Sequence, residues 1–282
     1  MVYLALSLWS LGEVERARRL VEDMIARAVQ GGHVATAVYG RIHYAIYELM
    51  RQNPAGATSH VRAAVGLARE HGMPLWAAWG HFLDPWAHWD SGDRVTRLEE
   101  MHRGVALCRE QGITLYLPLF ETMLAASEAE IGRIDAALAT AERATAETER
   151  TGQRWFEAET RRIRGEILLA RDPVNPSRAD AVLREALVVA RRQKARSFEL
   201  RAAPALAKLC QATKRDAEAH AVLSPSLEGF SPTPEFPEVE EAQLLLVALN
   251  PQSRTRVRIS AVDTNAKCVL ARLWPLSAND RI

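Results

Sequence analysis

Three side chains that can bind a metal lie close together in the segment GHFLDPWAHWDSG, residues 80–92: His81, Asp84 and His88. Spacings of three and four residues place them on one face of a straight helix, and imidazole and carboxylate groups are zinc ligands. Pro85 breaks this geometry, because proline lacks the helical N–H and clashes with the preceding turn, and the sequence offers no evident fourth ligand. Polar residues on a groove or between helices are the favoured interpretation, so no metal and no cofactor is predicted.

A charged cluster occupies the segment ETRRIRGE, residues 159–166. Glu159, Arg162 and Glu166 are three and four residues apart, so they share one helix face. In a groove, these side chains would bind a carboxylate-bearing or acidic peptide. The alternative is that they pair with one another on a solvated face, where each pair contributes a few tenths of a kcal/mol. We keep the three residues as candidates for a partner-binding groove.

Four of the seven tryptophans lie between residues 76 and 89. Because tryptophan is a favoured anchor in binding sites, one interpretation is an aromatic groove that grips a peptide. The favoured alternative is that the rings fill the core between neighbouring helices, where burial of each contributes about 2–3 kcal/mol. Trp79 and His81 complete the set of candidate groove residues, and the histidines outside residues 80–92 are expected on surfaces.

Composition narrows the classes of function. A net charge of +1 argues against nucleic-acid binding through phosphate neutralisation. Cys108, Cys210 and Cys268 are widely spaced and suit a reducing cytosol. The apolar run at the N-terminus is too short to span a bilayer, and the sequence contains neither a phosphate-binding GxxxxGK[ST] loop nor a nucleophile elbow. We therefore expect a cytoplasmic, non-catalytic protein without nucleic-acid or membrane partners.

The elements that position these residues are indicated by glycines with a period of forty residues. One series is Gly32, Gly72, Gly112 and Gly152, and a second, offset by twenty residues, is Gly12, Gly92 and Gly132. Glycine after a periodic apolar run ends a helix, because it adopts the left-handed conformation at little steric cost. Two series in each period of forty residues therefore predict two helices per repeat.

Alanines at fixed positions support this register. They follow the turns inside the repeats at Ala17, Ala57, Ala137, Ala179 and Ala219. Since helices that cross closely need small side chains, the pattern predicts an all-α solenoid of about six helical hairpins over residues 1–250, with a capping helix. The predicted helices are 1–11 and 13–30, 33–51 and 55–71, 74–90 and 93–111, 114–131 and 134–151, 154–171 and 177–193, 195–212 and 215–223, and 239–249.

Helical hairpins with small residues at these positions resemble tetratricopeptide repeats, although the period here is forty rather than 34 residues. AREHGMPLWAAWG, TGQRWFEAETRRIRGEILLA and EALVVARRQKARSFELRAAPALAKL resemble the C-terminal repeat region of large bacterial signalling proteins. Those proteins join a class III adenylate/guanylate cyclase domain, or a winged-helix regulator domain, to a predicted ATPase and then to the array. The resemblance covers about residues 3–250, and because the cyclase and ATPase modules are missing from this chain, it implies neither activity.

Two features depart from the repeat pattern. Pro85, Pro118 and Pro204 lie inside predicted first helices of the hairpins and are expected to kink each helix or delay its start. After Asn250 the helical period disappears, and residues 251–282 carry six basic and two acidic side chains. This basic tail is predicted to be poorly ordered or unrelated to the fold. It could also act as a basic arm for a partner.

The expected function is a protein-interaction or regulatory scaffold of the kind linked to signalling cyclases and ATPases. A protein or peptide partner, with a cyclase or ATPase module as one candidate, would bind in a concave groove lined by the first helix of each hairpin. The alternative is a repeat domain that senses a small-molecule effector. Because the chain opens directly into a helix, we expect it to begin within a repeat array.

Overall fold

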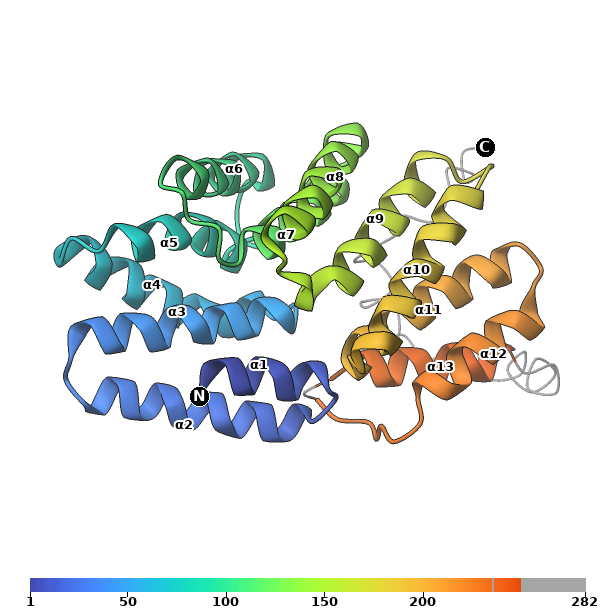
Figure 1. Cartoon of the computed structure of the whole chain (residues 1–282), viewed down its shortest axis with the longest axis horizontal. Helices are drawn as coiled ribbons and strands as arrows, with labels where there is room; N and C mark the ends of the chain where they lie inside the picture. The colour runs from blue at the N-terminus through green and yellow to red at the C-terminus, as the bar shows by residue number, and fades with distance from the viewer. Residues whose placement is uncertain (235, 250–282) are drawn as a thin grey trace.

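The computed structural model describes residues 1–234 and 236–249, and within these residues the chain is all-α (Figure 1). The helices are α1 (Val2–Ser10), α2 (Val14–Gln30), α3 (Val34–Met50), α4 (Pro54–Glu70), α5 (Pro74–Ala87), α6 (Arg94–Glu110), α7 (Leu117–Glu130), α8 (Ile134–Thr151), the short 3₁₀ helix η1 (Arg154–Phe156), α9 (Glu157–Arg171), α10 (Ser177–Gln193), α11 (Arg196–Ala212), α12 (Asp216–Ser226) and α13 (Glu238–Leu249). The predicted basic tail, 251–282, lies outside the described residues.

Consecutive helices pack in pairs, from α1 with α2 to α11 with α12, and α13 packs on α11 and α12. The predicted all-α solenoid of helical hairpins is therefore confirmed. The two helices of a hairpin are buried to different extents. In α11, twelve of seventeen residues are buried, whereas α4 buries four residues in a single stripe. The odd-numbered helices α3 to α11 thus form an inner layer, and the even-numbered helices form an outer layer around them.

The turns between helices contain residues with positive φ. The glycines of the two series have φ between +62° and +96°: Gly12, Gly32, Gly72, Gly92, Gly112, Gly132 and Gly152. This confirms that they lie where the chain leaves a helix in the left-handed conformation, which glycine adopts at little cost. Gln52, Lys194 and Lys214 adopt the same conformation at the corresponding turns, although they are not glycines.

Proline delays the start of one inner helix and lies inside two others. α7 begins at Leu117 rather than at the predicted residue 114, with Pro118 in its first turn, where the missing N–H needs no helical partner. The delayed start predicted for Pro118 is therefore confirmed. α5 ends at Ala87, two residues after Pro85. Pro204 lies inside α11, which continues to its end at residue 212.

The first and last hairpins of the array meet, as Figure 1 shows where α1 approaches α11 and α13. Trp9 of α1 packs edge-on against Phe198 of α11 and against Phe236, with ring centroids 5.4 and 5.9 Å apart. Ser197 Oγ donates a 2.5 Å hydrogen bond to the carbonyl oxygen of Trp9. The array therefore closes on itself, so that the inner helices face one another across a common interior.

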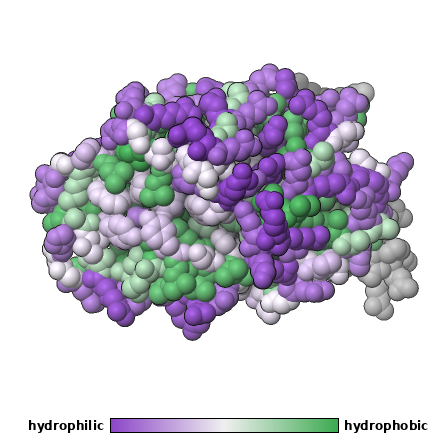
Figure 2. All heavy atoms as spheres, in the orientation of Figure 1, coloured by the Kyte–Doolittle hydropathy of each residue, from purple (hydrophilic) through white to green (hydrophobic). Residues whose placement is uncertain are grey.

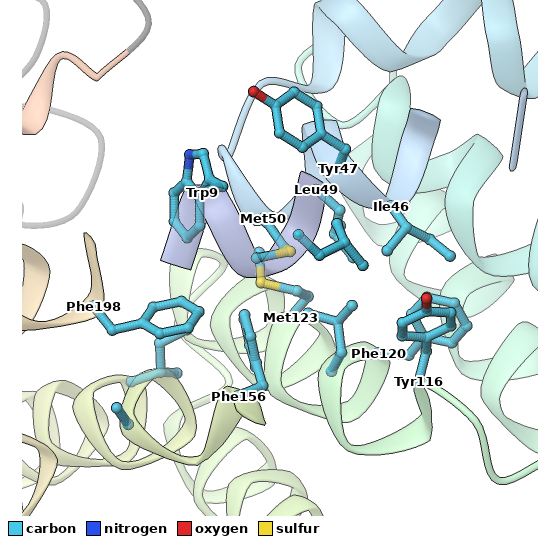
Figure 3. Close-up of a cluster of buried hydrophobic side chains, with 14 of the residues drawn as sticks. Trp9, Ile46, Tyr47, Leu49, Met50, Tyr116, Phe120, Met123, Phe156 and Phe198 are labelled. Atoms are coloured by element: carbon cyan, nitrogen blue, oxygen red, sulfur yellow. The ribbon is translucent and has the colours of Figure 1, made fainter. Parts of the chain in front are cut away.

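Apolar side chains fill this interior. Figure 3 shows Trp9, Phe198 and Phe156 around Met50 and Met123, and all five side chains are buried. The rings of Phe156 and Phe198 pack edge-on at 5.3 Å. Large aromatic and flexible thioether side chains thus occupy the space in which the sequence predicts a groove.

Candidate functional site

The predicted charged candidates lie in α9 and bind one another. Arg162 donates from Nε and Nη2 to the two carboxylate oxygens of Glu159, at 2.9 and 2.8 Å. Its Nη1 donates to Glu166 Oε1 at 2.7 Å. Glu159 and Arg162 are buried, whereas Glu166 is half-buried. The pairing that the spacing predicts is therefore present, but in the interior, and a partner outside the protein could contact only Glu166 of the three.

Arg201 of α11 connects this pair to the place where the array closes. Its Nη1 donates to the carbonyl oxygen of Met50 at 2.7 Å and lies 3.5 Å from Glu159 Oε1, while its Nε donates to Glu238 Oε1 at 2.6 Å. Gln52 Nε2 also donates to Glu159 Oε1, at 3.1 Å. We call the five side chains the closure network: Gln52, Glu159, Arg162, Arg201 and Glu238.

Electrostatics stabilise the charged forms in the closure network. Burial by itself would raise the pKa of Glu159, but Arg162 and Arg201 outweigh this effect and hold the pKa of that carboxyl below its usual value. Burial opposes the charge of Arg162 as well, yet Glu159 and Glu166 raise its pKa. Because ion pairs join residues of α9, α11 and α13, and the hydrogen bond of Gln52 adds the turn after α3, we interpret the network as holding the array closed.

Trp79 and His81, the other two candidate groove residues, lie in α5. Trp79 is 1% exposed and packs against His43 and Tyr116, with ring centroids 5.8 and 5.3 Å apart. It therefore belongs to the core, as the favoured alternative predicts. His81 is half-buried, and its backbone lies against Gly104 of α6. The five candidates are thus not brought together into one accessible groove.

The possible metal ligands around Pro85 do not form a site. His88 Nδ1 donates to the backbone carbonyl oxygen of Asp84 at 2.8 Å, and its Nε2 lies 3.3 Å from Arg62 Nη2 of α4. In residues 1–234 and 236–249, no three His, Cys, Asp or Glu side chains are grouped closely enough to hold a metal ion. This segment instead makes hydrogen bonds within α5 and to α4.

A buried histidine that the sequence analysis placed on the surface lies at the centre of an aromatic cluster. Ring centroids 4.1 to 6.2 Å from that of His43 belong to Tyr3, Tyr39, Trp76, Trp79 and Tyr116. The His43 Nδ1 donates to the backbone carbonyl oxygen of Tyr39 at 2.9 Å. Burial lowers the pKa of His43 to about 4, so the folded protein holds this imidazole neutral at pH 7.

This histidine predicts a loss of stability in acid. An unfolded histidine titrates near pH 6.5, so below that pH the unfolded chain binds a proton that folded His43 does not accept until about pH 4. The contribution of His43 to the free energy of unfolding should therefore fall by about 2–3 kcal/mol as the pH is lowered from 6.5 to 4.5. Urea unfolding of the wild type and of His43→Phe at both pH values gives the change in the free energy of unfolding of each protein. The difference between the two changes is the contribution of His43. An equally steep loss in His43→Phe would contradict the prediction.

Hydrophobic side chains gather on the outer side of α1. We call Tyr3, Leu4, Ser7 and Leu11 the α1 face; Leu4 is 53% exposed and Leu11 45% exposed. Figure 2 shows hydrophobic residues over the region of α1 on the visible face, whereas hydrophilic residues cover most of the α9–α10 side. A hollow of about 300 Å³ beside α1 is lined by Met1, Val2, Met24, Arg27, Ala28, Thr36 and Tyr39.

The α1 face was not among the predicted sites, although the sequence carries a signal for it. The helix sequence VYLALSLWS has apolar residues on all sides, a pattern that is typical of a helix enclosed on all sides. In the structure one side of α1 packs on α2, α3 and α11, and the other side is exposed.

The two cysteines of the described residues, Cys108 and Cys210, have free thiols in the interior. Cys108 is buried, and burial raises the pKa of its thiol to about 12, which makes it a poor nucleophile. No described helix combines the length and apolar character needed to cross a membrane. No protein-family model matches the chain, and no curated protein matches it significantly.

Proposed function

We propose that this protein is a non-catalytic, cytoplasmic interaction scaffold that binds a protein partner through the α1 face. The observation that carries this proposal is the concentration of exposed apolar residues. Of the eleven large hydrophobic side chains exposed among the described residues, five lie in the first hairpin: Met1, Tyr3, Leu4, Leu11 and Val29. Contiguous exposed apolar patches on soluble proteins mark interaction sites, whereas single exposed residues need no explanation.

Burial of the α1 face contributes part of the free energy of such an interaction. Fully burying an exposed leucine contributes about 1.5–3 kcal/mol, and because Leu4 and Leu11 are each about half exposed, covering both would contribute about 1.5–3 kcal/mol together, against the about 8 kcal/mol of a micromolar affinity. The interior of the array, by contrast, is already filled by its own aromatic and thioether side chains. This favours the outer side of the first hairpin over the concave side as the place of contact.

The resemblance to the repeat region of cyclase-linked and regulator-linked ATPases suggests the first partners to test. Purified class III cyclase and ATPase modules should be captured by the immobilised chain. The double variant Leu4→Glu/Leu11→Glu should bind at least tenfold more weakly, because two charges replace apolar contacts. Val188→Glu in α10 is the control, since Val188 is exposed but lies outside the first hairpin. Equal affinities for wild type and double variant would overturn the proposal.

The hollow beside α1 favours effector sensing as a second candidate. Its volume of about 300 Å³ is at the lower end for small-ligand sites. Arg27 pairs through Nε with Asp23 at 2.9 Å, and its guanidinium has further N–H donors for an acidic group of the ligand. A small molecule that binds only the folded state raises the melting temperature. A thermal-shift screen of small carboxylates, with Arg27→Ala as the control, therefore separates this candidate from the scaffold.

A further inference from the structure

We propose that an extended segment between α12 and α13 latches the closed array, so that its release opens the array at one place. We call residues 227–234 the strap, and Phe236 is the anchor that follows it. When the strap detaches, the first hairpin separates from α11 and uncovers the apolar side chains behind it, while the middle hairpins stay folded. This inference does not depend on what the α1 face binds.

The strap crosses the place where the two ends of the array meet. Figure 1 shows it as the orange segment that passes the turn between α1 and α2 on its way to α13. Thr233 Oγ1 donates to Glu15 Oε1 of α2 at 3.0 Å. Phe230 lies against the turn itself, because a Cβ placed on Gly12 would lie 3.0 Å from Phe230 Cζ. The strap therefore contacts the first hairpin where α1 ends and α2 begins.

The same segment also contacts the last inner helix. Arg196 of α11 donates from Nη2 to the carbonyl oxygen of Glu228 at 2.7 Å, and its Cζ lies 5.5 Å from the ring centroid of Phe230. The anchor Phe236 is 1% exposed, and its ring packs edge-on against Phe230 and Trp9, with centroids 5.5 and 5.9 Å apart. The strap and its anchor thus bind both ends of the array at once.

Side chains hold the strap in place, and its own backbone hydrogen bonds are local. Phe230 N donates to the Leu227 carbonyl oxygen and Phe236 N to that of Thr233, both at 3.1 Å. Five of the eight residues of the strap are exposed. An exposed segment with few buried contacts belongs to the least stable part of a fold. The strap can therefore detach without unwinding a helix.

Behind the strap, the contacts between the two ends converge on Trp9 (Figure 3). Ser197 Oγ donates to the Trp9 carbonyl oxygen, and the Trp9 ring packs on Phe198. The middle of the array is held by separate contacts, such as the stack of Phe82 on Phe120 at 4.5 Å. Release of the strap therefore weakens the joint at Trp9 and leaves the middle hairpins unchanged, which is a local opening rather than global unfolding.

Thiol labelling of the complete chain measures opening at two places in one molecule. Ser197 is fully buried at the joint, so the thiol introduced by Ser197→Cys reacts with N-ethylmaleimide only when the joint opens. Cys108 is buried in α6 and reports opening of the third hairpin. Mass spectrometry of proteolytic peptides gives the labelling rate of each thiol separately.

Phe236→Ala should speed labelling of the introduced thiol by at least about tenfold and leave the rate at Cys108 unchanged. Phe82→Ala is the matched control, since the same change in α5 should speed labelling of Cys108 and leave the rate at the introduced thiol unchanged. Phe230→Ala removes a ring from the strap but keeps the anchor, and it should give the pattern of Phe236→Ala with a smaller increase.

Equal increases at both thiols in Phe230→Ala would overturn the inference, because the strap would then stabilise the whole array rather than latch one joint. An unchanged rate at the introduced thiol in both strap variants would overturn it as well. If circular dichroism shows that Phe236→Ala has unfolded, Phe230→Ala decides between these outcomes.

Discussion

Arg201→Ala should lower the free energy of unfolding by about 3–5 kcal/mol. The Arg201 side chain is 4% exposed and contacts Glu159, Glu238 and the carbonyl oxygen of Met50. Without Arg201, the fully buried carboxylate of Glu159 keeps fewer positively charged neighbours. Glu238 loses its ion-pair partner. An uncompensated buried charge costs far more than a lost surface contact, because water cannot replace the missing partner.

The chain contains a matched control for this prediction. Lys208 lies two turns after Arg201 in α11 and pairs with Glu241 of α13, so both ion pairs join the same two helices. Lys208 is 48% exposed, and Lys208→Ala should therefore cost no more than about 1 kcal/mol. Urea unfolding at pH 7 gives both values. If the two variants lost the same stability, burial of the network would not be what makes Arg201 important.

A second variant separates charge from packing. Arg201→Met retains an apolar stem of similar length, so a loss of stability close to that of Arg201→Ala would assign the effect to the missing charge. Tryptophan fluorescence reports whether the two ends of the array stay together, because Arg201 Cζ lies 4.8 Å from the ring centroid of Trp9. Opening of the array would expose this tryptophan and shift its emission to longer wavelength. An unchanged spectrum in a destabilised variant would indicate that the ends stay together.

Local signals in the sequence predicted the helices closely. The positive-φ glycines and the alanines after the turns are short-range features, since each reports the backbone or the helix contact at its own position. For this reason the predicted bounds of α8 and α10 and the predicted last residue of α9 match the structure. Lys194 shows the limit of the signal: it adopts φ +56° where earlier repeats use glycine, so glycine spacing alone would have missed this turn.

The candidate groove could not be predicted in the same way. The spacing of Glu159, Arg162 and Glu166 correctly indicated that these side chains pair, because residues three and four apart meet on a helix. Their burial, however, depends on contacts from distant parts of the chain. Gln52 is 107 residues from Glu159, and Met50 is 151 residues from Arg201. These contacts form because the array closes, and no local sequence pattern specifies how strongly the array curves.

Gly104→Ala should lower the free energy of unfolding by about 2–3 kcal/mol, although alanine is the better helix former. A Cβ on Gly104 of α6 would lie 2.6 Å from Phe82 N and 2.8 Å from the His81 carbonyl carbon of α5. Both atoms belong to the backbone, so no side chain can rotate away, and the two helices must move apart. Separation would loosen the third hairpin, where Phe82 stacks on Phe120 of α7 at 4.5 Å.

Gly66→Ala is the matched control, since Gly66 is also inside an outer helix, α4. A Cβ on Gly66 meets no atom within 4 Å, so only the helix propensity changes, and the variant should gain about 0.5–1 kcal/mol. The two substitutions are chemically identical, yet the effects should have opposite signs in urea unfolding. Stabilisation by both would contradict the close approach of α5 and α6. Destabilisation by both would indicate that Gly66 has a contact of its own, because helix propensity alone favours alanine at both positions.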